Sequence, residues 1–125
     1  MSRRLLQICV AVLGLVPVGG GSYGVLYGAA MFADTGDGAA ADSHLRYLSG
    51  LLLAIGLGFW STVPRIETRA ARFRLLTALV FVGGLARLLG LVLRGMPTAL
   101  MLGGLVMELA VAPLLCLWQA SIARR

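Results

Sequence analysis

The chain has 125 residues, of which 59% are hydrophobic and only 13% are charged, and its mean hydropathy is +0.92. A soluble domain carries roughly a quarter charged residues and could not hide this much apolar surface from water. Spans of about 20 residues joined by short loops would use nearly all of the length, which leaves no room for a separate soluble catalytic module. We therefore expect an all-α integral membrane four-helix bundle, with residues 1–125 forming a single transmembrane domain.

The net charge of +6 and the pI of about 10.7 are also typical of proteins that bind nucleic acid. All eleven positive charges are arginines, however, and most of them stand at the ends of apolar segments. That placement is typical of the signals that set membrane topology. We therefore expect membrane lipid and no nucleic acid among the partners of this chain.

The first apolar segment covers about residues 5–32 and follows the pair Arg3-Arg4. It is long enough to cross a membrane with some tilt. A signal peptide has a shorter apolar region of about 7 to 15 residues and ends at a cleavage site, and no clean site appears here. The loop that follows is rich in aspartate and contains no Lys or Arg, which indicates the outer side of the membrane.

The second span covers about residues 45–63 and is followed by Pro64 and a loop that contains four arginines. Residues 75–93 form the third span, and Gly95-Met96-Pro97 makes a tight turn before the fourth span at residues 98–122. The arginine-rich loop and the two chain ends carry most of the positive charge. Both termini are therefore expected on the cytoplasmic side.

Stripes of small residues indicate where two of these helices approach each other. They recur every four residues in each of the first two spans, and such stripes let helix backbones come close together. The stripe residues are Gly20, Gly24 and Gly28 in the first span and Gly50, Ala54 and Gly58 in the second. We expect the first two helices to pack through these faces, with homodimerisation as the alternative use.

Two prolines lie inside spans and are expected to disturb the helices there. Pro17 and Pro113 each remove a backbone N–H, which leaves the carbonyls of Leu13 and Leu109 without their usual donors. Kinks commonly form at such positions. The second proline matters more, because its freed carbonyl is adjacent to the acid of the fourth span, Glu108.

Three ionisable residues lie inside apolar spans or at their edges, namely Arg46, Arg87 and Glu108. Each would cost a few kcal/mol if it faced lipid, so all three should face inward and find partners. Counted at 1.5 Å per residue from the outer ends, Arg87 lies ~10 Å deep and Glu108 ~16 Å deep, with Arg46 near the surface. Gly83 and Gly84, one turn before Arg87, leave room for its guanidinium.

Further polar side chains are expected near the outer ends of the spans. Tyr23 and Tyr27 place their hydroxyls at a depth in the membrane similar to that of Arg87. His44 and Asp42 lie at the outer ends of the spans, where a cluster of these residues would open outward. Together with Asp37, these residues offer only a loose oxygen-rich set, so we expect no metal and no cofactor. No nucleotide-binding loop, zinc motif, haem attachment sequence or nucleophile elbow is present.

Two interpretations of the ionisable residues remain open. Arg87 and Glu108 can form one buried ion pair that fixes helix register, with the tyrosines as interfacial anchors. They can instead line a polar pocket with Arg46, Tyr23 and the other outer residues, and bind a small amphipathic or anionic molecule. In that pocket Glu108 is the candidate catalytic acid or base, although the sequence does not decide whether the chain is an enzyme.

Two further functional alternatives follow from the same residues. The first is an accessory subunit whose ion pair and glycine stripes serve assembly into a homo-oligomer or a larger membrane complex. The second is a small proton-coupled transporter that uses Glu108, although drug exporters of this size have their acid in the first span.

Four short motifs together resemble those of the DUF4345 family of small bacterial membrane proteins, over about residues 10 to 120. The motifs are Arg46-Tyr47-Leu48-Ser49-Gly50, Gly83-Gly84-Leu85-Ala86-Arg87-Leu88, Gly95-Met96-Pro97 and Glu108-Leu109. The resemblance implies four membrane helices in a bacterial inner (plasma) membrane, without an established activity. In this chain Gly90 stands where the family has a small polar residue, so no hydroxyl role is expected there.

Overall fold

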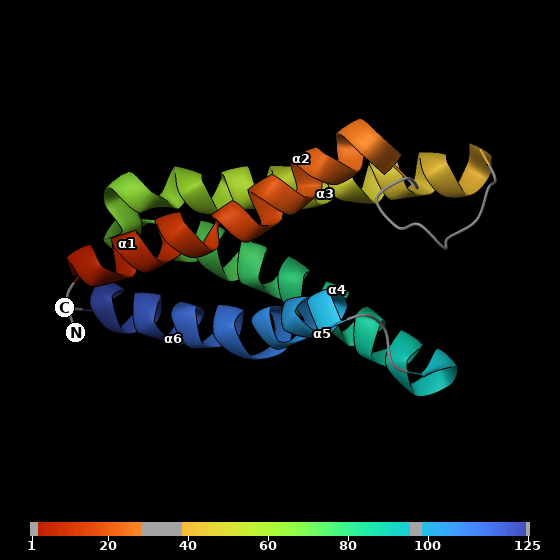
Figure 1. Cartoon of the computed structure of the whole chain (residues 1–125). Coiled ribbons are helices and arrows are strands. Elements are labelled where there is room, and N and C mark those ends of the chain that lie inside the picture. Colours follow the sequence, from red (N-terminus) through yellow and green to blue (C-terminus); the bar gives the residue numbers. More distant parts are fainter. Residues whose placement is uncertain (1–2, 29–38, 96–98, 125) are drawn as a thin grey trace. The chain divides into compact units, whose positions relative to one another are not determined.

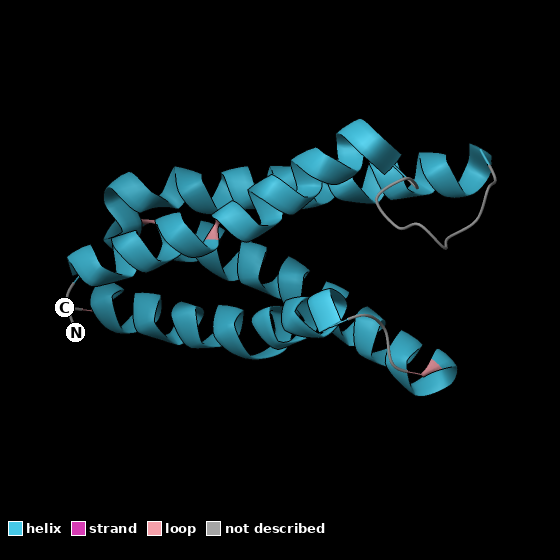
Figure 2. Cartoon of the chain, in the orientation of Figure 1, coloured by secondary structure: helices cyan, strands magenta, loops and turns pink. Residues whose placement is uncertain are grey.

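The structure is a computed structural model that describes residues 3–28, 39–95 and 99–124. Figure 2 shows that nearly all of these residues are helical, which confirms the all-α class. In chain order the elements are α1 (Arg3–Leu13), α2 (Leu15–Tyr27), α3 (Ala39–Thr62), the 3-10 helix η2 (Val63–Thr68), α4 (Ala70–Arg94), α5 (Ala99–Val106), the π-helix η3 (Met107–Val111) and α6 (Ala112–Ala123).

Four helical stretches are long and apolar enough to cross a membrane. They are Arg3–Tyr27, Asp42–Thr68, Ala70–Arg94 and Leu102–Ala123. Two of the helices begin well before the expected spans, α3 at Ala39 and α4 at Ala70. The added turns contain three alanines in α3 and two alanines and two arginines in α4. Alanine and arginine are good helix formers, so the helices continue beyond the apolar part. Residues 29–32 of the first expected span lie outside the described residues.

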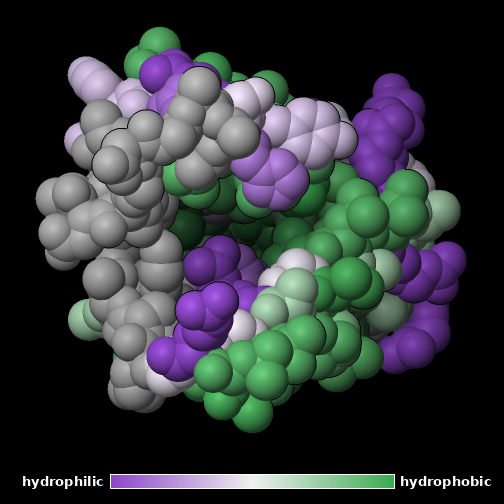
Figure 3. Space-filling view, turned by 90° about the vertical axis from the view of Figure 1, so that its right-hand side faces the viewer, coloured by the Kyte–Doolittle hydropathy of each residue, from purple (hydrophilic) through white to green (hydrophobic). Residues whose placement is uncertain are grey.

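The surfaces of the spans are apolar along most of their length. No more than 22% of the residues in the most apolar window of any span are buried. Leu26, Val92, Leu93 and Leu117 are each about 70% exposed, and hydrophobic residues occupy much of the face in view in Figure 3. Water would penalise this exposure by about 25 cal/mol per Å², whereas lipid would not. The four spans therefore indicate a multi-pass membrane protein.

Contacts between helices divide the chain into two compact units. The α2–α3 unit comprises residues 8–63, and the α4–α6 unit comprises residues 1–7 and 64–125. In the first unit α2 lies alongside α3, and in the second α4 contacts α5, η3 and α6 (Figure 1). Each expected functional residue therefore has its surroundings within one of these two units.

The closest backbone approach in the α2–α3 unit is at Gly21. A Cβ atom added there would lie 2.5 Å from the backbone nitrogen of Leu53 and 2.7 Å from the carbonyl oxygen of Ser49. On the facing helix, a Cβ atom at Gly56 would lie 2.7 Å from Cγ2 of Val18. Real Cβ atoms do not come this close to other atoms. Glycine is therefore the residue that these two positions accept without movement of the helices.

The residues of the two expected stripes lie along this contact in different ways. Gly24 and Gly28 are buried, Gly20, Gly50 and Gly58 are half-buried, and Ala54 is exposed. Cβ atoms at Gly20 and Gly50 would make ordinary contacts, 4.0 and 3.9 Å from apolar side-chain atoms. The closest approach between the two backbones thus lies at Gly21, one position beyond Gly20.

Regular α-helical bonding is interrupted just before each proline inside a span. Near Pro17, α1 and α2 are separated at Gly14, although Gly14 keeps its own helical bonds to Val10 and Val18. Near Pro113, the chain forms the π-helix η3, in which the N–H of Ala112 donates to the carbonyl of Met107, five residues back. Proline has no N–H to continue the ladder, so the expected disturbance appears at both positions.

Candidate functional site

Arg87 of α4 and Glu108 of η3 form a direct ion pair within the α4–α6 unit. Nε of Arg87 donates to Oε2 of Glu108 at 3.1 Å, and Nη2 donates to Oε1 at 3.1 Å. Two parallel bonds of this kind use the planar fork of the guanidinium and fix its orientation. The Arg87 side chain remains 37% exposed and the Glu108 side chain 16% exposed. The pair is thus well aligned and open on the arginine side.

Gly84 allows the carboxylate to come close to α4. It is buried one turn before Arg87, and a Cβ atom there would lie 2.9 Å from Cβ of Glu108 and 2.9 Å from Cδ2 of Leu109. The neighbouring Gly83 is different, because nothing lies within 4 Å of a Cβ atom at that position. Of these two adjacent glycines, Gly84 is the one that makes the contact and so positions the ion pair.

The backbone around Glu108 is also irregular. This residue lies in the π-helix η3, where the turn is widened before Pro113. Single π turns inside α-helices occur often at functional sites, because the wider turn redirects side chains and leaves carbonyls with weaker partners. An acid, a widened turn and a proline therefore coincide within six residues of one span.

The chemistry of this pair follows from the donors and acceptors that it contains. A guanidinium has five N–H groups, and the two bonds to Glu108 use two of them. Among the described residues, Arg87 has no other hydrogen-bond partner. The remaining N–H groups can therefore bind an oxygen atom of another molecule.

Arg46 makes a different set of contacts, within the α2–α3 unit. Its Nη1 donates to the carbonyl of Val25 at 2.7 Å and to that of Leu26 at 3.2 Å, and its Nε donates to Oδ2 of Asp42 at 2.8 Å. These carbonyls belong to the last turn of α2, where helix carbonyls have no partner within the helix. Arg46 thus caps α2, with a cation at the negative end of the helix dipole.

The other expected outer residues also belong to the α2–α3 unit. The rings of Tyr23 and Tyr27 contact each other at a tilt of 40° with their centroids 4.6 Å apart, and both residues are about half exposed. His44 is exposed, and Asp37 lies outside the described residues. Within the described ranges, no three His, Cys, Asp or Glu side chains are grouped so that they could hold a metal ion.

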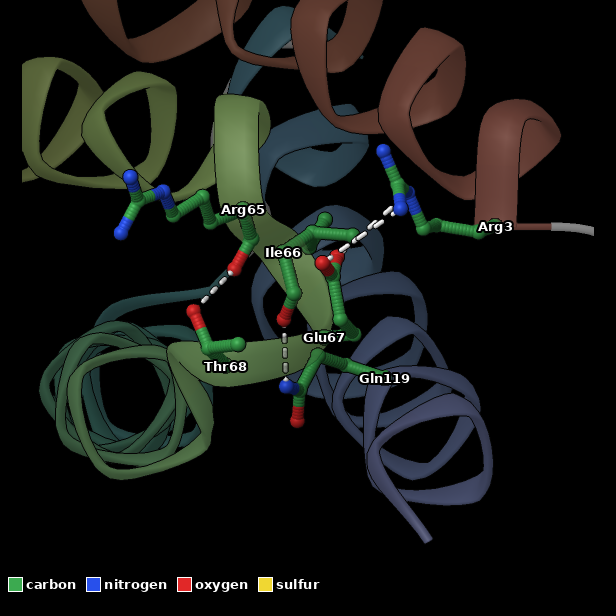
Figure 4. A network of polar contacts seen from close by, with 6 residues as sticks. All are labelled: Arg3, Arg65, Ile66, Glu67, Thr68 and Gln119. Carbon is green, nitrogen blue, oxygen red and sulfur yellow. Dashed lines mark hydrogen bonds and ion pairs between the residues drawn. The ribbon is translucent and has the colours of Figure 1, made fainter. Parts of the chain in front are cut away.

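A second polar cluster, which the sequence analysis did not identify, lies at the end of the α4–α6 unit that carries Arg3. Gln119 is completely buried, and its Nε2 donates to the carbonyl of Ile66 at 2.7 Å (Figure 4). Arg3 reaches Glu67 at 3.4 Å in the same cluster. No local sequence pattern marks this cluster, because the partner of Gln119 lies 53 residues away in the chain.

Comparison with known proteins gives one match. The family model described as a domain of unknown function (DUF4345) matches residues 5–119. No curated protein and no solved structure matches the chain. The match covers all four spans as far as Gln119, including the Arg87–Glu108 pair. The chain therefore belongs to the DUF4345 family.

Proposed function

We propose that this chain is a membrane-embedded binding protein whose Arg87–Glu108 pair takes the oxygen-bearing end of a small amphipathic or anionic molecule. The observation that supports this most directly is that the pair is joined by two bonds and yet leaves 37% of the Arg87 side chain exposed. The proposed setting is a bacterial plasma membrane, with both chain ends on the cytoplasmic side.

Stability alone is a weak reason to keep this pair. Buried ion pairs can often be replaced by apolar residues of similar volume with no loss of stability. Within a span, the N–H groups of Arg87 that Glu108 does not bind would face an environment without water, where an unpaired polar group is unfavourable. A ligand oxygen at this position would satisfy these N–H groups. Binding therefore accounts for the open side of the pair.

The charge of the pair indicates which ligands suit it. With Glu108 ionised the pair is neutral overall, and its free N–H groups suit a carbonyl or hydroxyl oxygen. The guanidinium itself is positively charged, so the same N–H groups also suit a carboxylate or another anion.

A structural role is the second candidate, because both carboxylate oxygens of Glu108 are bound directly by Arg87. In that case the chain would be an accessory membrane subunit, and the pair would serve only to join α4 to η3. The two proposals differ in what the doubly apolar variant Arg87→Leu/Glu108→Leu should do. It should fold in both cases, since it leaves no unpaired charge, but it should lose binding only in the first.

The test uses the purified protein in lipid nanodiscs and two probes with the same tail, oleate and oleyl alcohol. Calorimetric titration should show that Arg87→Leu/Glu108→Leu binds both probes at least tenfold more weakly than the unmodified protein does. Arg94→Leu, which alters an exposed arginine on the same helix, should bind the probes as the unmodified protein does. Circular dichroism should show equal helix content in all three proteins.

Unchanged affinity of the double variant for both probes would contradict the proposal, since the tail alone would then account for the binding. The accessory-subunit role would become the better explanation of the pair.

A further inference from the structure

Four polar side-chain atoms of the α4–α6 unit are buried and, within the described part of the chain, have no hydrogen-bond partner. Two are donors, Nε of Arg69 and Nε1 of Trp118, and two are acceptors, Oε2 of Glu67 and Oε1 of Gln119. Folded proteins pair nearly all such groups with protein atoms or with bound molecules. Within the described residues three of these atoms have no partner, and Oε2 of Glu67 has only the long ion pair with Nε of Arg3 at 3.4 Å. Together the four atoms point to an occupant that supplies both acceptors and donors.

The four side chains come from segments that meet at one backbone carbonyl. The carbonyl of Ile66 accepts from Nε2 of Gln119 at 2.7 Å and from the backbone N–H of Arg69 at 3.4 Å. Glu67 follows Ile66 in the chain, and Trp118 precedes Gln119 on α6. The amide of Gln119 therefore lies against the turn that carries Glu67 and Arg69. Figure 4 shows Gln119 beside Ile66 and Glu67.

Gln119 gives this cluster a fixed acceptor. Its side chain is 0% exposed, and the bond from Nε2 to Ile66 fixes which way the amide faces. As a result Oε1 points away from that carbonyl, as Figure 4 shows, and it cannot be exchanged with Nε2 without loss of the bond. A buried oxygen held in this way binds a hydrogen-bond donor.

Glu67 retains capacity for a second partner beside Arg3. The Arg3 nitrogens lie 3.4 Å from the Glu67 oxygens, whereas a close bond between a cation and a carboxylate measures about 2.8 Å. Both side chains are also partly exposed, at 54% and 31%. A cation that approaches from the membrane surface can therefore reach this carboxylate without displacing a strong bond.

We propose that this cluster binds the headgroup of an ethanolamine phospholipid. The phosphate would accept hydrogen bonds from Arg69 and Trp118, and the ammonium group would donate to Gln119 and Glu67. The cluster is placed where a headgroup lies, at the ends of the spans and ~16 Å along the fourth span from Glu108. Arg69, Trp118 and Glu67 are each half-buried, so part of each residue remains at the surface beside the buried amide.

The headgroup chemistry makes this proposal selective. A choline headgroup carries the same charges but has no N–H group to offer to Gln119. A glycerol headgroup has hydroxyl donors but no positive charge for Glu67. The cluster combines one fixed amide acceptor and one carboxylate with two N–H groups that can donate to a phosphate. This combination favours ethanolamine over both other headgroups.

The test is a titration of the delipidated full-length protein, followed by native mass spectrometry, with three lipids that share the same acyl chains. These are phosphatidylethanolamine, phosphatidylcholine and phosphatidylglycerol. We expect phosphatidylethanolamine to bind at least tenfold more tightly than either of the others. Trp118→Phe removes one N–H group and Gln119→Met removes the amide at similar volume, and each should reduce this preference to less than threefold.

The matched control is Trp60→Phe, since Nε1 of Trp60 already donates to the carbonyl of Ala11 at 3.0 Å in the other unit. That variant should keep the full preference. Gln119→Met also removes the bond to Ile66 and so can prevent folding. In that case Trp118→Phe still tests the proposal.

Equal binding of the three lipids by the unmodified protein would overturn the proposal, because buried water would then be the better occupant. Tighter binding of phosphatidylglycerol would overturn it as well, since anionic charge alone would account for the affinity. Soluble phosphoethanolamine is added as a competitor at the concentration of the lipid. If it displaces phosphatidylethanolamine completely, the site recognises a free phosphate ester and the lipid assignment fails.

Discussion

The two units of this protein hold their helices together by different means. In the α2–α3 unit the backbones touch at glycine positions, Gly21 above all, and the arginine of the unit binds carbonyls at a helix end. In the α4–α6 unit a charged pair joins two spans within the apolar region, and a buried glutamine joins a span to the turn before α4. Close packing dominates one unit and polar contact the other.

Because of this difference, the two units should tolerate different substitutions. In lipid, helices gain little from burying apolar side chains, so van der Waals contact at small residues and interhelical hydrogen bonds do most of the joining. A close contact between two helix backbones is disrupted when a single Cβ atom is added at the glycine that allows it. A charge pair fails when one partner is removed, and it is far less affected when both are removed. The following variants test this contrast, from the largest expected effect to the smallest.

The largest effect is expected for Gly21→Ala. The new Cβ atom would meet backbone atoms of Leu53 and Ser49, which cannot rotate away as a side chain can. We expect a loss of about 3 kcal/mol in the free energy of unfolding, measured by denaturation with SDS in mixed micelles. Gly19→Ala is the control, because nothing lies within 4 Å of a Cβ atom there. Similar losses in the two variants would remove the backbone contact as the basis of the α2–α3 packing.

The second effect concerns the charge pair. Glu108→Leu leaves Arg87 without its partner, and we expect a loss of about 2 kcal/mol, less than for a fully buried pair because Arg87 is 37% exposed. The double variant Arg87→Leu/Glu108→Leu should recover to within about 1 kcal/mol of the unmodified protein in the same SDS denaturation. A double variant that is less stable than Glu108→Leu would contradict the contrast between the units.

A smaller effect is expected for Gly84→Ala, where the packing also positions a polar group. The new Cβ atom would lie 2.9 Å from Cβ of Glu108, so η3 must shift away from α4. We expect a loss of about 1.5 kcal/mol in SDS denaturation. In the adjacent control, Gly83→Ala, the added methyl group meets no atom and should cause no loss. If both alanines are tolerated, the ion pair does not depend on this close approach.

The smallest effect is expected for Trp60→Phe. This change removes the hydrogen bond from the indole of Trp60 to the carbonyl of Ala11, and interhelical bonds in membranes contribute about 0.6 kcal/mol on average. Trp118→Phe removes an indole N–H that has no partner among the described residues, so this change should lower the stability of the lipid-free protein by less. Thermal unfolding in detergent compares the two variants. A larger loss for Trp118→Phe would indicate that its N–H group has a partner.

The spans and the Arg87–Glu108 pair could be anticipated from the sequence. Runs of apolar residues longer than about 18 have few outcomes other than membrane helices. Two opposite charges in neighbouring spans also have few partners other than each other, because lipid offers none. The structure brings these two side chains together. These features depend on residue type and on position along an apolar segment, and both can be read from the sequence.

The features that the sequence did not reveal depend on helix rotation. Gly19, Gly20 and Gly21 are consecutive, so any of the three could have faced α3, and only the packed structure selects Gly21. In the same way, the depth of Arg46 is compatible with a ligand site and with the helix cap that the structure shows. Burial of Gln119 requires the turn at Ile66 to fold back onto α6, which no local pattern encodes.

The π turn at Met107–Val111 has a consequence for the fourth span as a whole. A π turn accommodates about one residue more than an α turn, so the helix beyond it is out of phase by roughly 100° with the helix before it. Glu108 and Gln119, which an unbroken helix would place nearly on one line, are offset by about a quarter of a turn. The extra residue in this turn therefore rotates α6 about the helix axis relative to α5. That rotation determines the direction in which the Gln119 amide points.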